Sequence, residues 1–230
     1  MLLAPAPKDP VVMSYLALRK AVGIVAVSLP FAVAVPWGIV RHTIETSISA
    51  YYYTGMRTVF TGSLCAIAMF MLCARGYDRK DEIFSVLSAI CAIGVALFPT
   101  SPGFPNVHQK HVGIVHYSFA ALLFIILAIF CLFLFTMSAQ GRSLTTKKIQ
   151  RNRVYIVCGI AIVISLILLP IFTLLLKKPY GGITFETTSL LAFGLAWLVK
   201  GEMFLKDENA APATTRTTDG HEFIGDPHPS

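Results

Sequence analysis

Six apolar stretches alternate with short polar connections along this chain. They cover residues of about 21–40, 58–74, 83–100, 113–137, 154–176 and 184–205. A helix needs about 20 apolar residues to cross a hydrocarbon core of roughly 30 Å, and each stretch comes near that length. The runs are continuous rather than alternating, and they are about twice as long as a tilted membrane strand, which excludes a closed barrel. The pattern predicts an all-α polytopic membrane bundle of six transmembrane helices.

The two ends of the chain differ from this core. Residues 1–20 hold several prolines and a short apolar patch, and we expect a cytoplasmic N-terminal segment there. The first apolar run lacks a small-residue cleavage site, so it is expected to be a retained helix rather than a signal peptide. Residues 206–230 are rich in Ala, Pro, Thr, Asp and His and have no periodic apolar face. They predict a disordered cytoplasmic tail behind the transmembrane domain, residues 21–205.

Composition supports lipid as the solvent of this chain. Hydrophobic residues make up 55% and charged residues 13% of 230 residues, and the mean hydropathy is +0.69. A soluble globular domain does not have so many hydrophobic and so few charged residues. All five cysteines lie inside the apolar runs, which argues against a disulfide framework or a CxxC metal site.

The positions of Lys and Arg predict the orientation. With the N-terminus in the cytoplasm, fourteen of these residues are cytoplasmic and five are external. This bias predicts that both termini are cytoplasmic, with three external loops. The net charge of +7 therefore requires no nucleic-acid partner. The basic cluster in residues 147–153 is short and lacks interleaved aromatics, so we expect it to meet anionic lipid headgroups.

The first external loop, residues 41–57, is the most distinctive connection. Its three consecutive tyrosines, residues 51–53, are typical of an interfacial aromatic belt. Ser47, Ser49, Thr54 and Gly55 surround them, and together they predict an ordered re-entrant or capping turn rather than a simple connector.

A few charged and titratable residues fall within the membrane level at the external end. Glu186 is the deepest: counting back from Lys200 at about 1.5 Å per residue places it about 9 Å below the outer edge of the core. A carboxylate at that depth is costly unless it is paired or protonated. We expect Arg57 or His116 to compensate Glu186, either as a structural ion pair or in an outward-facing polar pocket roofed by the first loop. The predicted ligand-binding residues are Arg57, Glu186, His116, Ser49 and Glu45.

Three histidines precede or open the fourth apolar run, namely His108, His111 and His116. With a carboxylate from Glu186 or Glu45 they form a hypothetical metal site. There is no HExxH or CxxC spacing to support it, and the i, i+3 pair His108 and His111 shares a face only in a helix. We predict no metal and no cofactor; interfacial histidines that titrate near neutrality are the commoner case.

Several short motifs resemble known families. Ile48-Ser49, Arg57 and Phe60, the Arg75-Gly76-Tyr77 turn and the run from Ala96 to Thr100 look like a group of uncharacterised bacterial six-helix integral membrane proteins. More distantly, the layout resembles the damage-regulated autophagy modulator family. Ala50 stands where that family has Asp, and Arg57 where it has an acidic residue. The resemblance implies a six-helix membrane protein of a bacterial plasma (inner) membrane.

The alkaline ceramidase superfamily does not fit. Those membrane hydrolases hold zinc with Ser-x-x-x-His, Asp and His-x-x-x-His. Here Tyr51 follows four residues after Ser47, and the sixth run has no His-x-x-x-His.

Two classes of function are expected. The first is a non-enzymatic membrane protein that binds or moves a lipid or a small polar ligand at the external pocket. The second is a membrane-embedded hydrolase or transferase, metal-dependent or not, in which His116 or Glu186 acts as a base. The expected partners are membrane lipids, together with a second copy of the chain or another membrane protein.

Overall fold

The computed structural model describes residues 10–73, 79–137 and 145–205, which contain helices and no strand. The elements are α1 (Pro10–Arg41), the 3₁₀-helix η1 (Ser49–Tyr53), α2 (Arg57–Cys73), α3 (Arg79–Leu97), α4 (Val107–Ile129), the π-helical turn η2 (Phe130–Leu134), α5 (Thr146–Pro170), the π-helical turn η3 (Ile171–Leu175) and α6 (Gly181–Lys200). The prediction of an all-α protein is confirmed for these residues.

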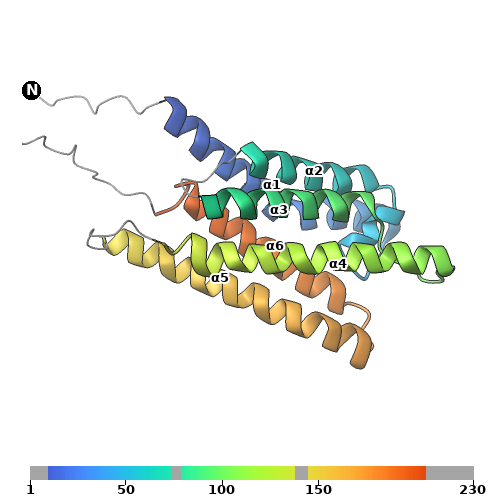
Figure 1. The fold of residues 1–230 in the computed structure, drawn as a ribbon. Helices are drawn as coiled ribbons and strands as arrows, with labels where there is room; N and C mark the ends of the chain where they lie inside the picture. Colours follow the sequence, from blue (N-terminus) through green and yellow to red (C-terminus); the bar gives the residue numbers. More distant parts are fainter. Residues whose placement is uncertain (1–9, 74–78, 138–144, 206–230) are drawn as a thin grey trace, which may run out of the picture.

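The long helices run side by side as an up-and-down bundle (Figure 1). Each packs on its neighbour in the sequence, and α6 packs on α1, which closes the ring. One end of the bundle, here called the loop end, carries the connection between α1 and α2 and the start of α6. The opposite end, here called the terminal end, carries the start of α1 and the end of α6 (Figure 1).

Four segments of the described residues are long and apolar enough to cross a membrane, namely Tyr15–Arg41, Val107–Leu134, Thr146–Leu175 and Gly181–Lys200. The chain is therefore a multi-pass membrane protein. α2 is apolar but only 17 residues long, and the first turn of α3 contains Asp81 and Glu82.

The helix boundaries differ from the predicted runs mainly at their polar ends. α1 begins at Pro10, so residues 10–20 continue the first span as one helix of 32 residues. α5 likewise begins at Thr146, well before the apolar run, because the Thr145 hydroxyl accepts the Lys148 N–H and caps it. Hydrophobicity marks the part of a helix in lipid, whereas capping decides where the helix starts.

Glycine allows the ring to close between α1 and α6. A Cβ atom on Gly23 would lie 2.8 Å from the Gly194 carbonyl oxygen, and one on Gly194 would lie 2.9 Å from the Gly23 carbonyl oxygen. The two backbones therefore approach more closely than any side chain permits, as small residues do at membrane helix crossings. Large apolar side chains such as Phe31, Val35 and Ile167 remain exposed on the bundle surface, where lipid would cover them.

Candidate functional site

Glu186 fastens the first loop to α6 at the loop end. Its Oε2 atom accepts the backbone N–H of Ile48 at 2.7 Å and that of Ser49 at 3.2 Å. These N–H groups lie at the start of η1, where a short helix leaves its first donors without internal partners. A carboxylate at this position makes two charge-assisted hydrogen bonds and complements the helix dipole.

A second contact holds the same loop. The Ile183 N–H donates to the Thr46 carbonyl oxygen at 2.7 Å. A Cβ atom on Gly182 would lie 2.7 Å from that oxygen, so the loop backbone lies directly against the start of α6. Ile48 and Tyr51 are buried beneath it, at 2% and 0% exposure. The prediction of an ordered turn in this loop is confirmed.

The predicted partners of Glu186 are wrong. Arg57 is exposed, with its guanidinium carbon 4.2 Å from the centre of the Tyr52 ring and a hydrogen bond to the Tyr52 hydroxyl. His116 is 1% exposed, and its Nδ1 donates to the Phe98 carbonyl oxygen at 2.6 Å. Each has its own partner within the described residues, and backbone N–H groups supply the compensation that we expected from a cation.

The two remaining predicted ligand residues, Ser49 and Glu45, belong to the same turn. Ser49 is buried, and its N–H contacts Glu186. The Glu45 side chain is partly exposed, and its N–H donates to the Tyr51 hydroxyl at 3.3 Å. Burial raises the pKa of Tyr51, and the Glu45 charge raises it further, against the lowering effect of that hydrogen bond. Ligand binding by these residues stays a prediction, since their contacts serve the loop.

Hydroxyl groups tie the turn to the connection between α3 and α4. The Tyr53 hydroxyl donates to the Thr100 carbonyl oxygen at 2.6 Å, and the Thr100 hydroxyl donates to the Tyr117 hydroxyl at 2.8 Å. Burial is the main cause that raises the pKa of Tyr53. The polar residues of the loop end therefore link the first loop to α6 and to the connection between α3 and α4.

The histidines of the fourth span do not gather. His108 and His111 are exposed in the first two turns of α4, whereas His116 is buried against α3. Across residues 10–73, 79–137 and 145–205, no three side chains of His, Cys, Asp or Glu are placed to hold a metal ion.

Two cavities stand out in the described part of the chain, and neither is lined by Glu186, Arg57 or a histidine. The expectation of a pocket formed by these residues is therefore not met by either cavity. One lies at the loop end, between α5 and α6. The other lies at the terminal end and is the more polar of the two.

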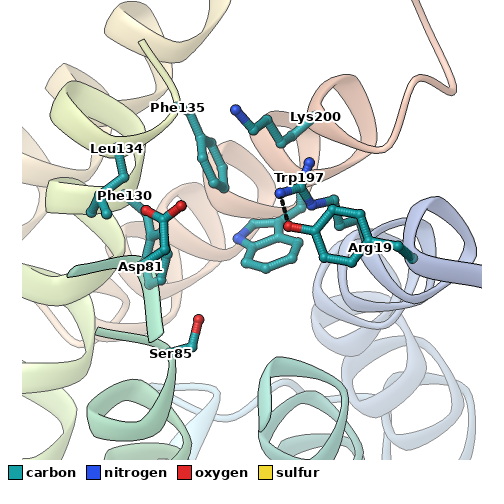
Figure 2. Close-up of a pocket in the computed structure, with 9 residues that line it drawn as sticks. Arg19, Asp81, Ser85, Phe130, Leu134, Phe135, Trp197 and Lys200 are labelled. Carbon is teal, nitrogen blue, oxygen red and sulfur yellow. Dashed lines mark hydrogen bonds between the residues drawn. The ribbon is translucent and has the colours of Figure 1, made fainter. Parts of the chain in front are cut away.

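The terminal-end cavity lies between α1, α3, the η2 turn and α6 (Figure 2). Its volume is about 20 Å³, enough for one water molecule or one ligand oxygen. Its lining residues are Tyr15, Arg19, Asp81, Ser85, Phe130, Leu134, Phe135, Trp197 and Lys200. Aromatic rings form one wall, and charged side chains from three helices surround it (Figure 2).

Charged groups of both signs act on Lys200 at this cavity. The Lys200 ammonium is subject to Coulombic repulsion from Arg19, Lys148 and Arg151 and to attraction from Asp81. Lys200 stands 5.2 Å from the centre of the Phe135 ring, and no hydrogen bond to its ammonium occurs within the described residues. Arg19 and Lys200 line the cavity, and such cations attract an anion.

Neighbouring carbonyl groups and one tyrosine side chain hold the basic groups in place. Lys148 Nζ donates to the carbonyl oxygens of Phe135 and Met137, each at 3.1 Å. Arg151 donates to the Leu205 carbonyl oxygen at 3.4 Å. Arg19 stacks on the Tyr15 ring and donates to its hydroxyl. These contacts fix where the basic side chains lie.

Trp197 supplies a neutral donor to the same site. Its side chain is 2% exposed, and its indole Nε1 has no hydrogen-bond partner among the described residues. The residue lines the cavity, and Figure 2 shows its indole nitrogen on the side toward Asp81. A buried donor without an acceptor costs about 1–3 kcal/mol, so an oxygen atom in the cavity that accepts this N–H would stabilise the protein.

Sequence reasoning missed this site. The positive-inside rule already explains why basic residues lie at this end, so it gave no reason to assign a site to Arg19, Lys148, Arg151 and Lys200. The sequence feature that could have indicated the site is Asp81, an acidic residue in the first turn of α3 that the positive-inside rule does not explain.

Comparison of the chain with protein-family models, curated proteins and solved structures gives no match.

Proposed function

We propose that this protein crosses a bacterial plasma membrane six times with both termini in the cytoplasm. Support comes from the placement of the start of α1 and the end of α6 at the same end of an up-and-down bundle (Figure 1). Basic residues crowd that end, in accordance with the positive-inside rule. In this arrangement the terminal end faces the cytoplasm, and the loop end faces the opposite side.

We further propose that the protein is not an enzyme but a lipid-binding protein, and that the terminal-end cavity recognises the phosphate of an anionic headgroup. One observation carries this proposal: Trp197, whose buried N–H has no acceptor among the described residues, lines a cavity that the cations Arg19 and Lys200 also line. The cavity is large enough for a single oxygen.

The chemistry of binding follows from these donors. One phosphate oxygen enters the cavity and accepts the Trp197 N–H, and the remaining oxygens stay at its mouth beside Lys200. Charge-assisted hydrogen bonds of this kind are about twice as strong as neutral ones. Asp81 disfavours a second negative charge in the cavity, so the site suits a phosphodiester with one charge better than a phosphate monoester with two.

The alternative of an embedded hydrolase or transferase gains no support from the described residues. His116 and Glu186, its two candidate bases, already bind backbone groups. The loop-end residues are better explained as the fastening of the first loop.

Trp197 itself reports on the cavity. The chain has only two tryptophans, so a Trp37→Phe variant leaves Trp197 as the sole indole. We expect a saturable change of its emission when the purified variant is titrated with phosphatidylglycerol, and no such change with phosphatidylcholine. Replacing Lys200 by Gln should weaken the response about tenfold, the loss expected for one charge-assisted hydrogen bond.

Lys147→Gln is the matched control, because Lys147 belongs to the same basic end but does not line the cavity. Equal weakening by Lys147→Gln and Lys200→Gln would mean general surface attraction and contradict the proposal. An equally strong response to inorganic phosphate in the absence of lipid would identify a soluble phosphate as the ligand and refute the lipid assignment.

A further inference from the structure

The second cavity is a groove at the loop end, where α5 passes into α6. Its volume is about 320 Å³, within the range of about 300–1,000 Å³ typical of small-molecule sites. Phe172 and Phe185 form an edge-to-face pair on its wall, with ring centres 5.1 Å apart. Tyr180, Lys178 and Thr184 also line it. The groove is thus largely aromatic, with one cation.

The groove follows an irregular end of the fifth span, where Pro170 precedes a π-helical turn. Proline has no backbone N–H, and the helix continues beyond it as the π-helical turn η3. The chain then reverses tightly, with the Lys178 N–H donating to the Phe172 carbonyl oxygen at 2.8 Å. A Cβ atom on Gly181 would lie 2.9 Å from the Phe172 Cβ, so α6 begins directly against this turn. The groove is therefore fixed by backbone contacts.

The position of the groove in the fold indicates which kind of molecule would occupy it. One membrane-crossing segment ends at Leu175, and the next begins at Gly181. The groove between them lies where hydrocarbon gives way to headgroups. Its aromatic wall suits an acyl chain, whereas the exposed Lys178 ammonium makes no hydrogen bond within the described residues and suits an anion at headgroup level.

We infer that this groove binds one anionic phospholipid from the leaflet at the loop end, with an acyl chain against Phe172 and Phe185 and the phosphate on Lys178. This site is separate from the terminal-end cavity in residues and in leaflet. It requires only that the protein crosses the membrane.

The test counts phosphatidylglycerol molecules retained by the full-length protein in native mass spectrometry after titration in detergent. It uses the Lys200→Gln variant as background, so that the terminal-end cavity does not dominate the count. We expect one retained lipid. Adding Lys178→Gln should weaken its binding about tenfold. Adding Lys177→Gln, a change of the neighbouring charge that does not line the groove, should leave it unchanged.

Thr184→Phe provides a steric test, because its ring would fill the groove. We expect loss of the retained lipid, with circular dichroism to show that the helices persist. Should this variant fail to fold, the pair Lys178→Gln and Lys177→Gln decides. Equal effects of those two changes, or full retention of the lipid in a folded Thr184→Phe variant, would overturn the inference.

Discussion

Glu186 is the residue whose role the structure changes most. Its carboxylate binds two backbone N–H groups of the first loop, while Arg57 binds Tyr52. Glu186→Ala should therefore lower the free energy of unfolding by about 1–3 kcal/mol, because two donors lose their acceptor. Thermal unfolding in detergent measures this. Thr188→Ala, on the exposed face of the same helix, is the control and should have little effect.

The same geometry predicts whether the effects of mutating Arg57 and Glu186 on stability are additive. Since the two side chains have different partners, the effects of Arg57→Ala and Glu186→Ala should add within about 0.5 kcal/mol. A double variant much more stable than that sum would show that the two charges meet and would restore the ion pair that the sequence favours.

Tyr53 gives the loop end a pH dependence of known sign. Burial raises its pKa above the ordinary value of 10.0, and its hydroxyl donates to Thr100. The contribution of this hydroxyl to stability is complete below pH 10.0, and it is lost as the pH rises through the raised folded-state pKa. Unfolding curves of the wild type and Tyr53→Phe should therefore converge in alkali, and a constant difference at all pH values would be inconsistent with this role.

At the scale of elements, the crossing of α1 and α6 depends on two glycines. A Cβ on Gly194 would lie 2.6 Å from Val27 Cγ2 and 2.9 Å from the Gly23 carbonyl oxygen. Gly194→Ala should thus force the helices apart and cost about 1–3 kcal/mol, measured by thermal unfolding in detergent. Gly62→Ala in α2, where a Cβ would meet nothing within 4 Å, is the matched control. Equal effects of the two changes would mean that helix propensity, not packing, decides.

For the whole molecule, the long apolar runs predicted the helical bundle because continuity and length are properties of the sequence alone. The partner of Glu186 was beyond such reasoning, since every loop offers backbone N–H groups and no pattern marks which loop docks. The terminal-end site could not be predicted from the sequence for a related reason. Arg19, Asp81 and Trp197 lie far apart in sequence, and only the closing of the ring between α1 and α6 brings their helices together.

The orientation of the bundle is testable through labelling. Single cysteines introduced at Tyr52 and Lys110, in a variant without native cysteines, should react with an impermeant thiol reagent added to intact cells. A cysteine at Lys148 should react only after the membrane is opened. Labelling of the Lys148 position in intact cells would reverse the proposed topology.

We propose that the terminal-end cavity holds the phosphate of an anionic lipid. The most direct measurement is an experimental structure of the protein in a bilayer that contains phosphatidylglycerol. We predict a headgroup phosphate with one oxygen about 3 Å from Trp197 Nε1 and another near Lys200 Nζ. A cavity that contains only water, with headgroup phosphates elsewhere on the basic end, would contradict the account.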